Sequence, residues 1–390
     1  MKKVFTTNYF IWIFLSALLM VQLSCSQKKN SQTTEDVISL SEEDLLEKRD
    51  ILLSSLIDSL EIIRLENVDE AYTDIGNVFV SDNHIAIRSH KGGPAKLFKR
   101  SGEYVGNIGN RGQGPGEYTF LYNVLIDENN GRIYVGLYNS NQLMTYNLKG
   151  EYIASEKIPL AFTVRKGAYY LDRENDRIGV INMPFDGMDS IFCYTQNFKG
   201  ESMGLISSEN YGIRPDYSSE IYADQRSGRF NFHIQNFGRA KQDTLFCYDY
   251  LNNKLTPLLT MFLPVKEGRY HVSYLDLPWH YAVITENYDE EFEDKKENLI
   301  LVDKKTRESY RVNLMNDYLG NIKIKPSHLI YNLKDGYYIQ RYEPEQLQEI
   351  ITQALEDTNL SSDSRKYLTT LNNSLDINDN TIILLGRLKQ

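Results

Sequence analysis

Short runs of alternating apolar and polar residues dominate the chain from about residue 60 onward, and helical spacing is rare there. This alternation is typical of β-strands with one buried face. One phrase recurs, namely an apolar or aromatic strand, a turn and a second strand, with anchor residues at Phe98, Tyr146, Tyr194, Tyr248 and Val302. The anchors are 48, 48, 54 and 54 residues apart. Because a repeat of about 50 residues fits one four-stranded propeller blade with its connecting loop, the pattern predicts an all-β propeller fold.

The pattern continues into a sixth unit near the C-terminal end. Residues 336–339 begin this unit and residues 380–385 form its late strand. Between them, residues 345–355 and 363–375 show helical spacing, the first of them after a proline that favours a helix start. We expect residues 60–65 to add a strand to the sixth unit and to close the ring. The sequence therefore predicts a six-bladed β-propeller with a short helical insertion in its last blade.

The first 24 residues have the pattern of an export signal. Lys2 and Lys3 precede an apolar run over residues 9–21 that is too short to span a bilayer comfortably, and small residues follow it. Residues 23–25, Leu-Ser-Cys, resemble the lipobox of bacterial lipoproteins, in which the cysteine is diacylated and becomes the new N-terminus. The resemblance implies lipid attachment at Cys25 and a stable membrane anchor. A secretory signal with an incidental cysteine is the alternative interpretation.

These features divide the chain into three predicted parts. Residues 1–24 are the signal peptide, residues 25–59 the lipidated N-terminus with a polar tether and a lead-in helix within 40–57, and residues 60–390 the propeller. The lipobox resembles the relaxed versions found in Bacteroidetes. In such lipoproteins acidic residues after the cysteine accompany surface export, whereas the stretch here is basic. The resemblance therefore implies an outer-membrane lipoprotein that faces the periplasm rather than the cell surface.

A glycine-rich connector follows the first repeat unit. Residues 108–118 read Ile-Gly-Asn-Arg-Gly-Gln-Gly-Pro-Gly-Glu-Tyr. This segment resembles the Gly-Gln-Gly-Pro-Gly-Glu connector of the six-bladed β-propeller lipoproteins of Bacteroidetes, which are similar to NHL-repeat propellers. Residues 378–385 resemble the C-terminal strand of that family, with Thr381 in place of an expected proline. The resemblance covers about residues 60–390 and implies the fold and the envelope location, without an established catalytic set.

The connector has a structural and a functional interpretation. Its glycines permit left-handed backbone and close approach, and Glu117 is placed to accept hydrogen bonds from backbone N–H groups or to pair with Arg111. In the functional interpretation, exposed amides together with Arg111, Gln113 and Glu117 bind an anionic or sugar ligand at the loop face of the ring. His90 and the nearby Arg88 belong to another blade loop and complete the set of candidate ligand-binding residues.

Composition excludes several classes of protein. Hydrophobic residues make up 41% and charged residues 25%, which is ordinary for a globular protein and excludes a disordered or fibrous chain. The 43 Lys and Arg residues are outnumbered by 53 Asp and Glu residues, and the formal net charge is −10. Because phosphate binding requires a basic stripe and none is present, no nucleic-acid partner is expected.

The sequence contains no recognisable catalytic or metal-binding motif. Its six histidines form no HxxxH or HxH pair, a GxSxG elbow is absent, and the connector glycines do not follow GxGxxG. Cys193 and Cys247 occupy equivalent positions in neighbouring repeat units, too far apart for a disulfide, so we expect two buried thiols. No cofactor is predicted.

Aromatic residues cluster in two long segments between repeat units. They are Tyr211, Tyr217, Tyr222, Tyr274, Trp279, His280 and Tyr281. Two interpretations stay open at this point. Such rings either form exposed platforms that stack on sugars or peptide side chains, or they cover the junctions between blades.

Three hypotheses for the function follow. The first is a membrane-anchored envelope lipoprotein whose propeller binds a protein or a glycan partner through one loop face. The second is an enzyme, a metal-dependent propeller hydrolase or lyase, with Asp, Glu, Asn or His converging at the central channel and a divalent cation bound there. The third is a purely structural envelope component, with a featureless channel. Fold alone does not distinguish these hypotheses.

Overall fold

The computed structural model describes residues 37–390 apart from 42–44, 46, 75, 225–229, 236–242, 263–268 and 289–294. Within the described part of the chain, Ile38–Gln390 form one compact unit. The predicted signal peptide, the predicted lipid-attachment residue Cys25 and the polar tether lie outside the described residues.

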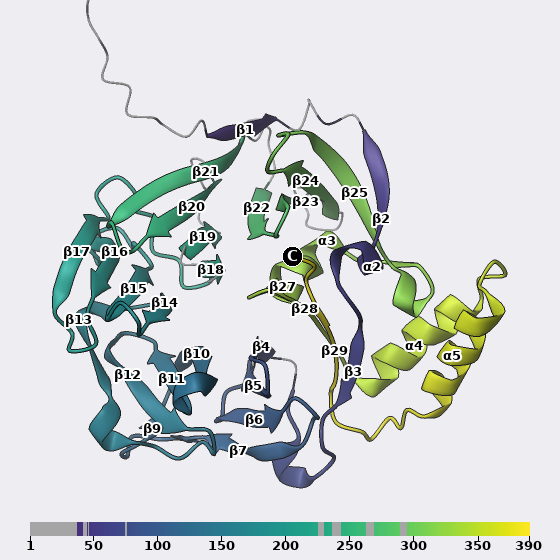
Figure 1. Cartoon of the computed structure of the whole chain (residues 1–390), viewed down its shortest axis with the longest axis horizontal. Coiled ribbons are helices and arrows are strands. Elements are labelled where there is room, and N and C mark those ends of the chain that lie inside the picture. Colours follow the sequence, from purple (N-terminus) through teal and green to yellow (C-terminus); the bar gives the residue numbers. More distant parts are fainter. Residues whose placement is uncertain are drawn as a thin grey trace, which may run out of the picture. The chain divides into compact units, whose positions relative to one another are not determined.

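Six blades of four antiparallel strands stand around a central axis, each with its first strand innermost, and in blades 4 and 5 a further parallel strand lies outside the fourth (Figure 1). Blade 1 consists of β4 (Gly76–Val80), β5 (His84–Ser89), β6 (Ala95–Lys99) and β7 (Tyr104–Ile108). Blade 2 consists of β10 (Leu121–Asp127), β11 (Arg132–Leu137), β12 (Ser140–Asn147) and β13 (Ile158–Val164). Blade 3 consists of β14 (Gly167–Asp172), β15 (Arg177–Asn182), β16 (Ile191–Gln196) and β17 (Ser202–Ser207). Blade 4 consists of β18 (Glu220–Asp224), β19 (Phe230–Gln235), β20 (Asp243–Asp249) and β21 (Lys254–Phe262). Blade 5 consists of β22 (Arg269–Asp276), β23 (His280–Tyr288), β24 (Lys295–Asp303) and β25 (Ser309–Asn316). Blade 6 consists of β27 (Leu333–Lys334), β28 (Tyr337–Tyr342), β29 (Ile382–Arg387) and β3 (Glu61–Arg64). The predicted all-β, six-bladed β-propeller is confirmed.

The hydrophobic core lies in layers between adjacent blades. Ile85 and Ile87 of β5 pack against Tyr337 and Ile339 of β28, so that blades 1 and 6 share one cluster of buried side chains. The other face of blade 1 contributes Ala86 and its neighbours to a cluster shared with blade 2. A strand in this position buries both faces, which explains why the middle strands read as nearly continuous apolar runs.

The ring closes through strands from the two ends of the propeller. β3 pairs antiparallel with β29, with Ile62 opposite Leu384 and Ile63 opposite Ile383. Leu384 and Ile383 are buried, and Ile63 is 5% exposed. The prediction that residues 60–65 would supply a strand to the last blade is confirmed.

The lead-in segment differs from its prediction. Instead of a helix within residues 40–57, β1 (Ile38–Ser41) pairs parallel with β21 and β2 (Lys48–Leu52) pairs parallel with β25. Only α2 (Leu53–Leu56) is helical. The helix prediction was wrong because the outer edges of blades 4 and 5 have unpaired backbone groups, and pairing with these edges outweighs the weak local preference of the segment.

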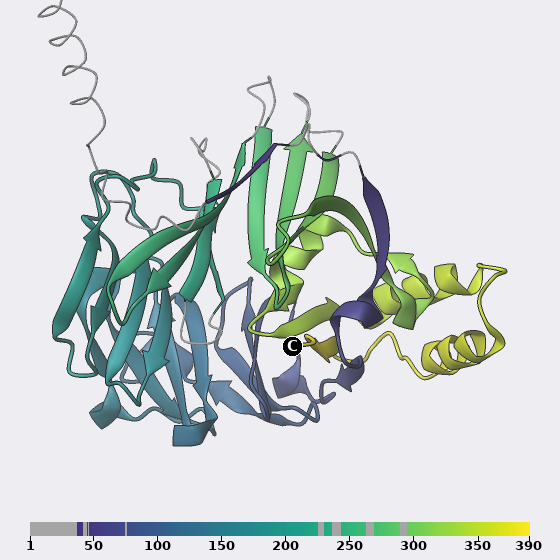
Figure 2. The same cartoon turned by 45° about the horizontal axis from the view of Figure 1, so that its top comes forward.

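Two predicted helices form the insertion in blade 6, between β28 and β29. They are α4 (Pro344–Leu355) and α5 (Ser362–Asn373), which project from the side of the ring (Figure 2). A capping box between Glu343 and Gln346 begins α4. A further helix, α3 (Pro326–Asn332), precedes β27 and was not predicted, since it is too short to show helical periodicity. None of the helices among the described residues is both long enough and apolar enough to cross a bilayer.

Minor elements complete the fold. β26 (Ile322–Lys323) pairs with β25, and the connector forms a two-stranded parallel pair, β8 (Asn110–Arg111) with β9 (Glu117–Tyr118). β9 lies at the outer rim of the ring, between blades 1 and 2 (Figure 1).

Polar contacts join the turns of neighbouring blades. Glu128, in the first turn of blade 2, accepts hydrogen bonds from the Oγ of Ser81 at 2.7 Å and the backbone N–H of Asn83 at 2.9 Å, and its Oε1 lies 2.7 Å from Nδ1 of His84. Burial opposes ionisation of this carboxyl, but the bonds from His84, Ser81 and Asn83 outweigh it and lower the pKa of Glu128 to about 2.

Replacing the closing strand's buried isoleucine tests the importance of closure. We expect Ile63→Ala to reduce the free energy of unfolding by about 2–4 kcal/mol, since it removes apolar contacts and leaves a cavity. Ile377→Ala is the matched control, because this side chain is 66% exposed. Urea unfolding of both variants measures the effect, and equal midpoints would show that the β3 contact contributes little.

The turn contact predicts a pH dependence. Because the folded pKa of Glu128 lies below its ordinary value of 4.5, its ionised form stabilises the fold above about pH 4.5, and this contribution is lost as the pH falls towards 2. Glu128→Gln is therefore expected to be less stable than the wild type at pH 7, with a difference that shrinks below pH 4.5. Glu349→Gln, on the exposed side of α4, is the control. A constant difference from pH 7 to pH 2.5 would contradict the assignment.

Candidate functional site

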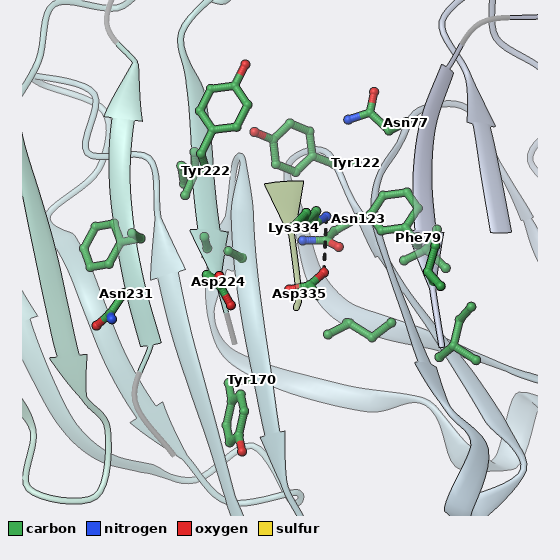
Figure 3. A pocket seen from close by; sticks show the side chains of 18 of the residues that line it. Asn77, Phe79, Tyr122, Asn123, Tyr170, Tyr222, Asp224, Asn231, Lys334 and Asp335 are labelled. Atoms are coloured by element: carbon green, nitrogen blue, oxygen red, sulfur yellow. Dashed lines mark ion pairs between the residues drawn. The ribbon is translucent and has the colours of Figure 1, made fainter. Parts of the chain in front are cut away.

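A large cavity occupies the central channel of the ring. It has a volume of about 1320 Å³ and is lined from all six blades. One lining residue from each blade, in order, is Asn77, Tyr122, Tyr170, Tyr222, Tyr274 and Asp335. Figure 3 shows Asn77, Tyr122 and Tyr222 towards one end of this channel, with Asp224 and Asp335 farther along it. A cavity of this size accommodates an oligosaccharide or a short peptide.

The two mouths of the channel differ in the elements that form them. Inner strands begin at one mouth, beside the connections between blades, and they end at the other mouth in tight turns to the second strand. We call the first the arginine mouth, defined by Arg88, His90, Tyr122, Glu220 and Arg341. The second is the aspartate mouth, defined by Asp127, Asp172, Asp224, Asp276 and Asp335.

Glu220 is held in a fixed orientation at the arginine mouth. Its Oε1 accepts a hydrogen bond from Nζ of Lys166 at 2.9 Å, and its Oε2 accepts one from the hydroxyl of Tyr122 at 2.5 Å. Burial and the nearby Glu220 charge raise the pKa of Tyr122, so this hydroxyl stays protonated as a donor. Lys166 is 4% exposed and also donates to the carbonyls of Tyr217 and Ser219, at 2.7 and 2.8 Å.

Arg88 is bound by neutral groups. Its Nη1 donates to the carbonyls of Leu121 and Tyr122 at 3.3 and 3.0 Å, and its Nη2 donates to Oδ1 of Asn77 at 3.1 Å. Burial lowers the pKa of Arg88, and the charge of Glu220 opposes this shift. A guanidinium has a pKa so far above neutrality that it stays charged, and Arg88 therefore brings a positive charge to the mouth.

Arg341, Asp74 and His90 form the adjacent part of the mouth, between blades 6 and 1. Burial lowers the pKa of Arg341, and the charge of Asp74 opposes the shift. Partial burial, followed by the charges of Arg88 and Arg341, lowers the pKa of His90, so this ring is neutral at pH 7. Asp74 lies 3.9 Å from Nζ of the exposed Lys91.

Aromatic rings surround the arginine mouth. Phe120 and Tyr331 line the channel and are 57% and 52% exposed. Phe120 contacts Tyr138 edge-on, with ring centroids 5.8 Å apart, and Tyr138 lies 6.3 Å from Tyr217. Tyr331, on α3, lies 5.9 Å from Tyr222. Exposed ring faces beside polar groups suit a ligand with both apolar and hydroxylated surfaces.

The aspartates of the opposite mouth serve the turns and the contacts between blades. Asp127 caps the turn to Asn130 and pairs with Arg173 of the next blade at 3.2 Å. Asp172 accepts hydrogen bonds from Asn175 and, at 2.8 Å, from the hydroxyl of Tyr250 in blade 4. These carboxylates therefore join neighbouring blades.

The enzyme hypothesis required metal-binding side chains to converge at the channel. In the part of the chain that the structure describes, no group of three or more His, Cys, Asp or Glu residues is arranged to hold a metal ion. His84 contacts Glu128 in a turn, and His233 is buried against Tyr222, where burial lowers its pKa to about 3.

The structure separates the candidate ligand-binding residues predicted from the sequence. Arg88 and His90 line the channel, whereas Arg111, Gln113 and Glu117 are not among its described lining residues. Oε2 of Glu117 accepts a hydrogen bond from the N–H of Gly114 at 2.9 Å. A Cβ on Gly112 would lie 2.0 Å from the same oxygen. These contacts favour the structural interpretation of the connector.

The other sequence predictions have separate outcomes. Cys193 and Cys247 are free, buried thiols, as predicted. Among the aromatic candidates, Tyr274 is 2% exposed inside a blade junction, while Tyr217 and Trp279 are 57% and 64% exposed. The junction interpretation therefore holds for Tyr274, and the platform interpretation stays a prediction for the exposed Tyr217 and Trp279.

Sequence reasoning missed Arg341, Glu220, Lys166 and Tyr331. The recurring aspartate at the end of the inner strands was a usable signal for the strand ends, because it occurs at the same point of blades 2, 3, 4 and 5. The residues of the arginine mouth occur once each and follow no repeat, so no periodicity marks them.

A family described as "Domain of unknown function (DUF4934)" matches residues 35–387 of the chain. No protein with a curated description matches. Among solved structures, a protein from Bacteroides fragilis assigned as exported is similar with a TM-score of 0.57 and 15% identity, covering 91% of this chain and 100% of that one. A DUF4221 member from Bacteroides vulgatus is similar with a TM-score of 0.46 and 12% identity, covering 86% and 97%. At these identities, the first likeness supports the fold.

Glycine substitutions test the structural role of the connector. Gly116 has a φ of +78° and is packed against Tyr152, whose Cβ would lie 2.6 Å from an added Cβ. We expect Gly116→Ala to destabilise the fold by about 2–4 kcal/mol, from both backbone strain and the clash. Gly131→Ala is the control, because Gly131 has a φ of +65° with nothing within 4 Å. Thermal unfolding compares them, and equal losses would show that packing at Gly116 is unimportant.

Proposed function

The chain belongs to the DUF4934 family, and we propose that it is a membrane-anchored envelope lipoprotein whose propeller binds a glycan or protein partner at the arginine mouth. The observation that carries the proposal is the channel itself. A cavity of about 1320 Å³ opens between fixed polar side chains and exposed aromatic rings at one mouth. A purely structural component has no need of such a mouth, and a featureless channel was the expectation for that role.

The site has the properties of a binding site rather than of a catalytic centre. Glu220 is paired with Lys166 and Tyr122, and Arg88 is bound to carbonyl oxygens. These contacts fix the orientation of the polar groups before a ligand arrives, which reduces the entropy lost on binding. Exposed rings at Phe120 and Tyr331 favour a glycan over a protein partner, because a sugar ring stacks on a single aromatic face.

The proposed location rests on the sequence. The signal-like segment 1–24 and the lipobox-like residues 23–25 support an anchor at Cys25, and the basic residues that follow favour the periplasmic face of the outer membrane. The resemblance to NHL-like propeller lipoproteins, carried by the connector, supports a location in the cell envelope.

Binding at the mouth is tested with two tyrosine variants. The mature full-length protein, purified in a nonionic detergent, is applied to a panel of immobilised neutral and acidic oligosaccharides and short peptides. We expect Tyr331→Ala to weaken binding by about tenfold or more, as loss of a stacked aromatic at a binding site does. Tyr367→Ala is the control, since Tyr367 on α5 is 49% exposed and Tyr331 is 52% exposed. Equal binding by the two variants, or no binding by the wild type, would contradict the proposal.

The anchor is tested by fractionation. Cys25→Ala is expected to move the protein from the membrane fraction to the soluble fraction, because it removes the site of both acyl chains. Ser26→Ala should leave the protein in the membrane fraction. Retention of the Cys25→Ala variant in the membrane would refute lipid anchoring at this residue.

A further inference from the structure

Two guanidinium groups at the arginine mouth have no carboxylate partner. Within the described residues, no Asp or Glu oxygen lies within 4.0 Å of a nitrogen of Arg88 or Arg341. The third cation, Lys166, is paired with Glu220 at 2.9 Å. The charge of Glu220 still acts on Arg88, and the charges of Asp74 and Glu343 act on Arg341, so these two positive charges are opposed at a distance but not paired.

Arg341 also has a hydrogen-bonding capacity that the protein does not use. Its Nη1 is buried and has no acceptor among the described residues, although the side chain lines the channel. A buried donor without an acceptor is costly, and a charged donor more so. A bound carboxylate would accept from this group and recover that cost, and a guanidinium matches the two oxygens of a carboxylate in a bidentate geometry.

The opposite mouth differs in that most of its charged side chains are paired. Asp127, Asp172 and Asp276 end inner strands there, next to Asp335 of blade 6. Arg173, Lys304 and Lys334 pair with Asp127, Asp276 and Asp335 there, so the cations of that mouth are already bound to carboxylates. The unpaired guanidinium of Arg341 is therefore the better position for a ligand carboxylate.

The remaining groups around the mouth suit a sugar. Phe120 and Tyr331 present exposed ring faces at the channel. Glu220 offers carboxylate oxygens to hydroxyl donors, and Asn77 adds an amide at the same end of the cavity. The exposed aromatic rings suit the pyranose rings of a sugar, the polar oxygens suit its hydroxyl groups, and the guanidinium suits a carboxylate.

We propose that the arginine mouth binds an acidic oligosaccharide of the uronate class, with a ligand carboxylate on Arg341 and a sugar ring on Tyr331. This inference rests on the proposed binding function and specifies its ligand. Arg88 and the neutral His90 flank the carboxylate position, and Glu220 accepts from sugar hydroxyls.

Calorimetry with a matched pair of trisaccharides tests the inference. The mature full-length protein in a nonionic detergent is titrated with trigalacturonate and with its fully methyl-esterified form, which has the same rings without charge. We expect the ester to bind at least about tenfold more weakly, and the affinity for the acid to fall as salt is raised. The same protein is titrated with a tripeptide free acid.

Three arginine variants locate the interaction. Arg341→Gln should remove the difference between the acid and the ester, Arg341→Lys should retain part of it, and Arg111→Gln, in the connector, should leave it unchanged. Thermal unfolding establishes that each variant is folded. If Arg341→Gln does not fold, Arg341→Lys and the comparison of acid with ester still decide the question.

The outcomes separate this inference from the proposed function. Equal binding of acid and ester would overturn the carboxylate assignment while leaving a glycan-binding propeller. Binding of the tripeptide acid without trigalacturonate would overturn the glycan class. No binding of these probes or of any member of the oligosaccharide and peptide panel would overturn both proposals.

Discussion

Closure of the ring is the constraint on which the rest of the structure depends. Each blade has two apolar faces, and both are buried only when every blade has two neighbours. β3 closes the ring by pairing with β29, so that residues far apart in sequence complete blade 6 and give every blade two neighbours. β1 and β2 extend the same principle, since they cover the outer edges of blades 4 and 5 before β3 enters blade 6. The channel follows from closure, because six inner strands arranged around an axis are too far apart to fill the centre.

The two mouths carry different chemistry because different parts of the repeat form them. At the aspartate mouth every blade turns from its first to its second strand, and a tight turn favours a side chain that accepts from the backbone, as Asp127 does from Asn130. The same structural need in successive blades gathers aspartates there, and Arg173, Lys304 and Lys334 pair with three of them. At the arginine mouth the chain passes between blades through connections of different lengths, which tolerate unrelated residues. Arg88, Glu220 and Arg341 could therefore be placed there without disturbing the repeat.

The sequence predicted what the repeat determines and missed what occurs once. Alternating strands at a regular period identified six blades, and the helical spacing of α4 and α5 identified the insertion. Arg88 and His90 could be identified because they lie beside a loop. Arg341 could not be identified, because in the sequence it is a single polar residue within the strand β28. Only the packing of blade 6 on blade 1 brings it to the channel. The prediction of a lead-in helix was wrong for the same reason, because β1 and β2 pair with strands that lie more than 200 residues farther along the sequence.

The ring also determines how well the site can discriminate between ligands. Tyr122, Glu220 and Arg341 come from strands of three different blades. Arg341 lies on β28, which is hydrogen-bonded on both sides, and the inner strands β10 and β18 are each paired with the second strand of their blade. Their spacing is therefore set by the number of blades rather than by a loop that adapts to each ligand. Because Arg88 and Glu220 are already oriented by partners within the protein, binding at this mouth requires little ordering. The free donor of Arg341 is the exception, and it makes the mouth selective, because a neutral ligand leaves that buried charge without an acceptor.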